Sequence, residues 1–158
     1  AELANDFTGT NDVVKQCLQW LIDHDYPIKY ACCIYATAPF IDPEYLRQGF
    51  ERLVETGKSF AFSATLFPFP IQRAIRINED GCVEAIYPEY IFVRSQDLEK
   101  TYHDAGQFYW GTAESFLNNV VVYSSKAIPV VLPNYLVCDI DTFEDWKMAE
   151  LMFKALKG

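Results

Sequence analysis

The fold is decided by residues 30–67, which read YACCIYATAPFID, PEYLRQGFERLVETG and KSFAFSATLF in succession. The run Tyr30–Tyr35 is apolar and has the length of a central parallel strand that is covered on both faces. Asp42 and Pro43 suit an N-cap and a first helical turn, so a helix is predicted from Pro43 to about Glu55. Ser59–Phe67 is then the next strand. This strand–helix–strand unit predicts an α/β fold whose ligands bind beyond the carboxyl ends of the strands.

Weaker patterns extend this α/β prediction to the rest of the chain. Apolar residues at helical spacing predict helices over Asn11–His24 and Phe143–Leu156. The turn sequence Asn78–Gly81 between two short apolar runs predicts a β-hairpin. Further strands are expected at residues 106–110, 120–123, 128–132 and 135–138, with a short helix at residues 113–117. No linker-like segment divides the chain, so one domain is expected.

Composition excludes several classes of protein. A chain of 158 residues that is 51% hydrophobic is long and apolar enough to form a real core. The formal net charge of −9 disfavours nucleic acid as a partner. No apolar run has the length of a membrane span, and the first residues do not resemble a signal peptide. The five cysteines form no CxxC pair, which is typical of reduced packing residues in a cytoplasmic protein.

Two aspartates follow the last predicted strand. If Tyr135–Cys138 is extended and the extension continues, Asp139 and Asp141 point to the same side of the chain. Two carboxylates so placed can share Mg²⁺, which prefers oxygen ligands and often also binds substrate phosphates. The alternative is that both aspartates merely belong to a turn and helix cap, because Thr142 and Asp145 have the spacing of a near capping box.

Five separated motifs together carry a family resemblance. They are AELA (residues 1–4), TGT (8–10), IYATAP (34–39), DAGQFYW (104–110) and DIDT (139–142). In this order they resemble the cytidylyltransferases that activate nonulosonic acids, most closely the pseudaminic acid branch, with the CMP-sialic acid synthetases as relatives. The resemblance implies a Rossmann-like nucleotidyltransferase fold, a three-layer sandwich with a mixed, mostly parallel sheet. Residues 1–158 are then expected to be the C-terminal part of a single cytidylyltransferase domain, lacking its N-terminal strands and CTP-binding loop.

The same resemblance implies an activity and a nucleotide site. The expected reaction transfers CMP from CTP to a nonulosonic acid, with pseudaminic acid as the first candidate and N-acetylneuraminic acid as the alternative. Asp139 and Asp141 match the metal-binding aspartates and would hold Mg²⁺. Residues 8–10 match a segment that contacts cytosine, and the alternative is a turn that caps the first helix. Thr37 and Pro39 keep the pattern of the next loop, whereas positions 35 and 38 depart from it.

The acceptor sugar carries a carboxylate, for which arginine is a suitable partner. Basic residues of the family align near residues 72–73 and 94, and the segment 103–109 offers polar groups for the sugar. The imidazole of His103 is also a candidate for the general base. The alternative for each of these residues is a solvated or structural role. The candidate nucleotide-binding residues are Thr8, Gly9, Thr10 and Thr37, and the candidate sugar-binding residues are Gln72, Arg73, Arg94, His103, Asp104, Gln107 and Tyr109.

Family members form homodimers, and the aromatic stretches Phe60–Phe69 and Tyr87–Phe92 are suited to an interface of that kind. A homodimer is therefore expected. The alternative to the enzyme is a non-catalytic sugar-binding or dimerisation module derived from such a protein. The two hypotheses differ in whether a triphosphate-binding loop accompanies this sequence.

Overall fold

The computed structural model describes residues 3, 5 and 8–157, so that Ala1, Glu2 and Ala4 of the AELA motif lie outside the described residues. The helices are α1 (Thr10–Asp23), α2 (Pro43–Thr56), α3 (Ala113–Leu117) and α4 (Phe143–Lys157). The strands are β1 (Tyr30–Ile34), β2 (Phe60–Leu66), β3 (Ile75–Ile77), β4 (Val83–Ala85), β5 (Tyr102–Thr112) and β6 (Ala127–Leu132). Short 3₁₀ turns are η1 (Ile71–Arg73), η2 (Pro88–Tyr90), η3 (Ser95–Asp97) and η4 (Asn134–Leu136). The four helices and the β3–β4 hairpin agree with the sequence predictions.

The main sheet is mixed. Its strand order is β1-β5-β2-β6, with β5 antiparallel to both neighbours and β2 parallel to β6. The predicted strand–helix–strand unit β1-α2-β2 is present, but β5 lies between its two strands. Within the described residues β1 is therefore an edge strand paired only with β5, and its prediction as a central parallel strand was wrong in position. A continuous apolar run does not reveal which strand lies next to it, and in this structure the side chains of β1 are half-buried or, at Ile34, exposed.

Two further strand predictions were also wrong. Residues 135–138 form no strand, because the chain enters η4 directly after Pro133 and continues without regular structure. Residues 120–123 are irregular as well, although Val120 and Val122 pack against the core beside α1 and α3. In both segments some apolar side chains are partly buried although the backbone that carries them is a loop and not a strand.

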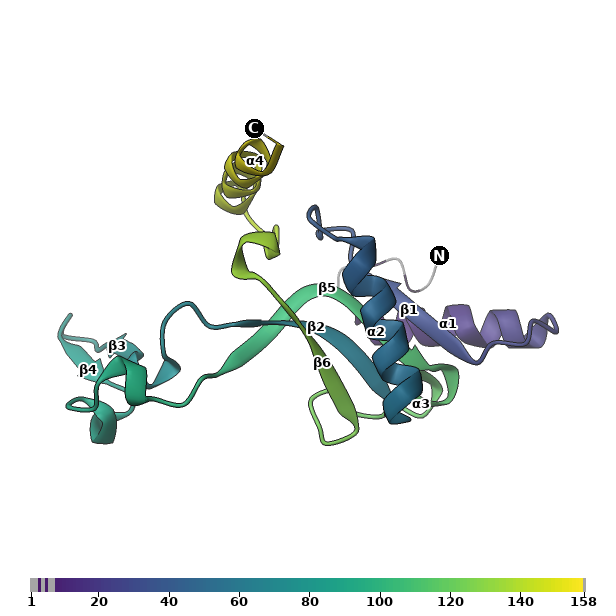
Figure 1. Cartoon of the computed structure of the whole chain (residues 1–158), viewed down its shortest axis with the longest axis horizontal. Helices are drawn as coiled ribbons and strands as arrows, with labels where there is room; N and C mark the ends of the chain where they lie inside the picture. The colour runs from purple at the N-terminus through teal and green to yellow at the C-terminus, as the bar shows by residue number, and fades with distance from the viewer. Residues whose placement is uncertain (1–2, 4, 6–7, 158) are drawn as a thin grey trace.

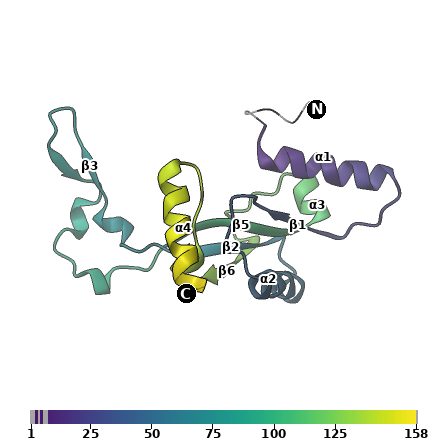
Figure 2. The same cartoon turned by 90° about the horizontal axis from the view of Figure 1, so that it is seen from above.

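Helices cover both faces of the sheet, which gives three layers. Figure 2 shows α1 and α3 on one face and α2 on the other. The core on the first face contains Leu18, Phe60 and Phe116. The core next to α2 contains Phe108, Val130 and Leu132. This arrangement confirms the expected α/β three-layer class.

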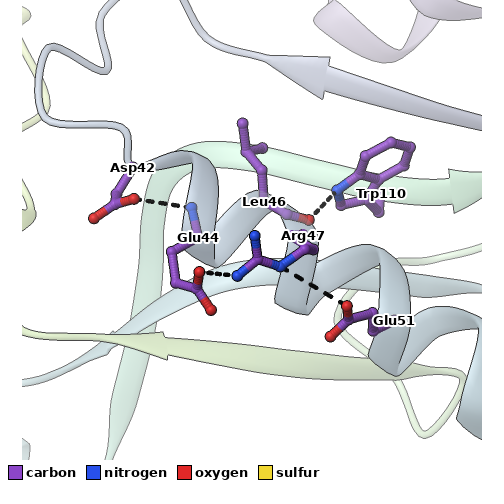
Figure 3. Close-up of polar contacts among 6 residues, drawn as sticks. All are labelled: Asp42, Glu44, Leu46, Arg47, Glu51 and Trp110. Carbon is purple, nitrogen blue, oxygen red and sulfur yellow. Dashed lines mark hydrogen bonds and ion pairs between the residues drawn. The ribbon is translucent and has the colours of Figure 1, made fainter.

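Helix α2 is fixed at the end that follows the 35–42 loop. The Asp42 carboxylate accepts a hydrogen bond from the Glu44 backbone N–H at 2.8 Å, which satisfies one of the free donors of the first turn. Trp110 of β5 donates its indole N–H to the Leu46 carbonyl at 2.9 Å. Figure 3 shows these contacts and the exposed pairing of Arg47 with Glu44. The cap and the indole together hold the loop between β1 and α2 against β5.

Residues 67–101 form an arm that leaves the sheet between β2 and β5. It contains the hairpin β3–β4 and the turns η1, η2 and η3. Figure 1 shows that the arm extends to the opposite end of the molecule from α1. Among the described residues, no helix has both the length and the apolar character required to cross a membrane.

Candidate functional site

A bulge in β5 is the first element of the site. Phe62 of β2 pairs with Tyr109, whereas Ala64 pairs with Asp104, so Ser63 alone faces residues 105–108. The Ser63 hydroxyl oxygen accepts hydrogen bonds from the N–H groups of Gln107 and Phe108, each at 3.1 Å. Gly106 adopts a φ of 62°, in the left-handed region that favours glycine. The DAGQFYW motif therefore supplies both the glycine and the strand residues that this bulge requires.

Asp139 lies directly over the bulge. A Cβ added to Gly106 would be 3.4 Å from the Asp139 Oδ2 atom, so this glycine allows the carboxylate to approach the backbone closely. The hydroxyl of Thr37, in the loop after β1, donates to Asp139 Oδ1 at 3.4 Å. Three of the motifs that carry the family resemblance thus meet at one point. They are IYATAP, DAGQFYW and DIDT.

The N-terminus of α4, which follows Asp141, is capped by another residue. The carboxylate that caps the helix belongs to Asp145, which accepts hydrogen bonds from the backbone N–H groups of Asp141 and Thr142 at 3.2 and 2.8 Å. Asp145 N–H in turn donates to the Thr142 hydroxyl at 3.2 Å, which completes the predicted capping box. These hydrogen bonds, above all those from Thr142, lower the pKa of Asp145. The side chains of Asp139 and Asp141 are not the capping groups, and both are exposed.

These two carboxylates have the donor chemistry expected for a shared cation. Within the described part of the chain, neither forms an ion pair with a lysine or arginine. The same residues contain no cluster of three or more His, Cys, Asp or Glu side chains that would enclose a metal ion. Two exposed carboxylates suit an ion that completes its coordination with water and substrate oxygens, as Mg²⁺ does.

Asp104 connects the bulge to two tyrosines. Its Oδ1 atom accepts a hydrogen bond from the Gly106 N–H at 2.8 Å. Its Oδ2 atom accepts hydrogen bonds from the hydroxyls of Tyr109 and Tyr123. Partial burial and the neighbouring Asp104 carboxylate raise the pKa of Tyr109, and they raise the pKa of the more exposed Tyr123 to about 12. Both phenols are therefore protonated donors at neutral pH.

A cavity of about 380 Å³ lies on the α1 side of β1 and β5. Thr10, Tyr35, Tyr109 and Tyr123 contribute to its lining. Gly9 is the N-cap residue of α1, without a side chain to cap it, and Thr8 exchanges hydrogen bonds with Asn5 at 2.8 and 3.0 Å. Of the predicted nucleotide-binding residues, Thr10 lines this cavity and Thr37 contacts Asp139.

The arm carries three of the predicted sugar-binding residues. The Arg73 guanidinium donates to the carbonyls of Ile91 and Val93, and Arg94 pairs with Asp97 at 2.7 Å. Gln72 donates to the Glu99 carbonyl at 3.3 Å. Figure 1 shows the arm directed away from β1 and α1. The structure does not bring these residues together with Asp139 in one chain.

The remaining sugar candidates lie in β5. The ring of His103 contacts the Asp104 carbonyl at 2.7 Å and lies 4.6 Å from the ring of Phe67. Gln107 is only 1% exposed, and its side-chain amide donates to the Leu136 carbonyl at 2.5 Å. Gln107 thus ties η4, which leads to Asp139, to the bulge. Sequence reasoning missed Ser63 and Tyr123, since an isolated serine in a strand and a tyrosine in a loop carry no recognisable pattern.

Comparisons with known proteins agree with these motifs. The chain is 38% identical over 152 residues to a pseudaminic acid cytidylyltransferase of Campylobacter jejuni, and 37% identical to that of a second strain. A Helicobacter pylori protein named pseudaminic acid cytidylyltransferase and UDP-2,4-diacetamido-2,4,6-trideoxy-beta-L-altropyranose hydrolase is 29% identical over 148 residues. These alignments include 94–96% of the chain. No protein-family model matches the chain.

A solved structure gives independent support for the fold. CMP:2-keto-3-deoxy-manno-octonic acid synthetase complexed with CTP aligns with a TM-score of 0.56 and 11% identity, over 95% of this chain and 70% of the other. The chain spans 66% of the length of each Campylobacter relative and 28% of the Helicobacter relative. The sequence similarity to the Campylobacter proteins and the meeting of three motifs at Asp139 lead to one conclusion: over almost its whole length the chain is similar to the pseudaminic acid cytidylyltransferases.

Proposed function

We propose that the protein transfers CMP from CTP to a nonulosonic acid, with pseudaminic acid as the acceptor, and releases pyrophosphate. The observation that carries this proposal is the contact of Asp139 with Thr37 and with the Gly106 bulge. The names of the Campylobacter relatives support the acceptor, and the CTP bound in the structural neighbour supports the nucleotide. Because the chain spans only part of its relatives, the activity is proposed for the whole protein.

The chemistry assigned to the site is positioning and charge neutralisation. In this reaction the sugar hydroxyl attacks the α-phosphate, the bond to pyrophosphate breaks, and the hydroxyl proton passes to solvent or to a base. Asp139 and Asp141 would hold Mg²⁺, which neutralises phosphate charge when it is bound. Thr37 orients one oxygen of Asp139 through its hydroxyl, and the absence of a side chain at Gly106 leaves room for the other. The residues of the chain thus fix one metal ligand before the substrates bind.

The substrate assignment is tested by incubating the full-length protein with Mg²⁺, one nucleotide and one sugar. CTP, UTP and ATP are each combined with pseudaminic acid, N-acetylneuraminic acid or 2-keto-3-deoxy-manno-octonic acid, and products are separated by ion-exchange chromatography. The proposal predicts equal amounts of CMP-sugar and pyrophosphate with CTP and pseudaminic acid, and no product after chelation of the metal. Faster turnover of another sugar would change the acceptor, and no product with any pair would refute the transferase.

We also propose that two copies of the chain associate through the arm. Phe69 and Phe92 in the arm are 78% and 97% exposed, and Ile77 at the hairpin is 73% exposed. Such exposure of large apolar side chains on one segment is typical of an association surface. The alternative of a non-catalytic dimerisation module uses the same surface, and the substrate assay above separates the two.

The cytoplasm is the compartment that we propose for this activity. All five cysteines are free thiols in the structure. Burial raises the pKa of Cys32 to about 12 and also raises that of Cys33, so these two thiols have little thiolate character. Unpaired cysteines are typical of proteins in reducing compartments.

A further inference from the structure

We infer that Tyr123 is a positioning residue of the CMP-transfer site. With Tyr109, it holds Asp104 in the orientation that shapes the Gly106 bulge next to Asp139. The inference rests on the proposed function for its catalytic consequence, but its structural part stands on hydrogen bonds within the chain. Tyr123 lies outside the five motifs that carry the family resemblance.

The contacts form a short chain of linked groups. The hydroxyl of Tyr123 and that of Tyr109 donate to the same Asp104 oxygen, and the second oxygen of Asp104 binds the Gly106 N–H. Gly106 is the residue over which the Asp139 carboxylate lies. The links from Asp104 to Gly106 and Tyr109 lie within β5, whereas the link to Tyr123 joins residues 19 positions apart. Tyr123 therefore acts on Asp139 through Asp104 and Gly106, without touching the reacting atoms.

Tyr123 is the link that depends on a loop. It lies in the irregular segment 118–126, whereas Asp104 and Tyr109 belong to the same strand. Its side chain is 68% exposed, yet its ring packs edge-on against Phe62 at 5.8 Å and its hydroxyl reaches Asp104. Because the ring has its own packing partner, Tyr123→Phe removes the hydrogen bond and retains the ring contact.

Loss of one donor changes the preferred orientation of the Asp104 carboxylate. Without the Tyr123 hydroxyl, Asp104 Oδ2 can replace the lost hydrogen bond by turning towards solvent or by adopting another rotamer. Either movement weakens the hydrogen bond from Gly106 N–H to Asp104 Oδ1. The bulge then samples other conformations, and Asp139 loses its fixed support. The expected kinetic signature is a lower kcat with a nearly unchanged KM for CTP, because the orientation of Asp139 matters most in the transition state.

The test uses full-length wild-type protein, Tyr123→Phe and the control Tyr26→Phe. Tyr26 is exposed after α1 and takes no part in this network. Amide hydrogen exchange is followed by NMR at Gly106, with Gly81 in the hairpin turn as an internal reference. We expect Tyr123→Phe to accelerate Gly106 exchange and to lower kcat, each by roughly tenfold, with the melting temperature little changed. Tyr26→Phe should leave all three values as in the wild type.

Each outcome decides a separate statement. Unchanged exchange at Gly106 in Tyr123→Phe would overturn the link between Tyr123 and the bulge. Faster exchange with an unchanged kcat would overturn the positioning role. A wild-type protein that transfers no CMP would refute the proposed function, and the exchange comparison would still decide whether Tyr123 holds the bulge.

Discussion

Thr37 and Asp139 are separated by 102 positions in the sequence, and a hydrogen bond of 3.4 Å joins their side chains. Thr37 lies in the loop after β1, and Asp139 follows η4. Each segment is held in place by a residue of β5. Trp110 anchors the start of α2 behind the Thr37 loop, and Gln107 anchors η4 ahead of Asp139. The contact is therefore a consequence of how β5 organises the chain around it.

Replacement of Thr37 by valine removes this hydrogen bond and keeps the shape of the side chain. We expect kcat/KM for CMP transfer to fall about tenfold. This loss is at the lower end of the range for a hydrogen bond to a charged group, because the Thr37–Asp139 pair lies near solvent. Thr37→Ser, which retains the hydroxyl, should stay close to wild-type activity. Steady-state kinetics of the three proteins provides the measurement. Equal activity of Thr37→Val and wild type would show that the Thr37 hydroxyl has no role in the reaction.

Gly106→Ala tests the close approach of Asp139 to the bulge. The positive φ of 62° disfavours alanine, and its Cβ would lie 3.4 Å from Asp139 Oδ2. Gly81→Ala is a matched control, since Gly81 has a φ of 77° with open space around it. Both variants should lose about 1–2 kcal/mol of unfolding free energy in urea titrations. Only Gly106→Ala should also lose most of the transferase activity, and similar activities of the two variants would argue against the contact.

The cap of α4 predicts a pH dependence. Hydrogen bonds from Thr142 lower the pKa of Asp145 from its ordinary value of 3.8. Asp145 therefore stabilises the folded state above that ordinary pKa, and this contribution is lost as the pH falls through the lowered value in the folded protein. Asp145→Asn should melt below wild type near pH 7, and the difference should shrink as the pH falls below 3.8. Glu144→Gln, at the adjacent exposed position, should show no such convergence in thermal unfolding followed by circular dichroism.

The arm predicts the oligomeric state. Phe92→Ser places a polar group on the arm, where the phenylalanine is 97% exposed, and it should shift wild-type dimers towards monomers in light scattering coupled to gel filtration. Phe143→Ser is the control, because Phe143 is 84% exposed but lies on α4, outside the arm. A monomeric wild type would refute the dimer, and a dimer that survives Phe92→Ser would place the interface elsewhere.

Local signals in the sequence predicted the helices and the hairpin well. Asp42, Pro43 and Gly57 gave the bounds of α2 to within a residue or two, since an N-cap, a first-turn proline and a left-handed C-cap act on neighbouring backbone groups. The hairpin at Asn78–Gly81 followed from its turn residues in the same way. The strand order did not follow. The insertion of β5 between β1 and β2 depends on contacts between distant residues, which no local pattern contains.

The site was predicted in part for the same reason. The motif resemblance selected Thr37, Asp104 and Asp139, which the structure places along one continuous set of contacts around Gly106. The prediction from strand geometry, which placed Asp139 and Asp141 on the same side of an extended chain, does not hold. The strand expected before them is η4 followed by irregular backbone. Tyr123 became visible only when the loop after α3 was seen to fold back on Asp104.

The most direct test of the central claim compares wild type with Asp139→Asn in full-length protein, by ³¹P NMR with CTP, Mg²⁺ and pseudaminic acid. Asp139 is exposed, so the substitution should change the unfolding free energy by less than about 0.5 kcal/mol. The proposal predicts CMP-sugar and pyrophosphate from the wild type, and a rate at least about a hundredfold lower from the variant. A folded Asp139→Asn protein that forms CMP-sugar at the wild-type rate would contradict it.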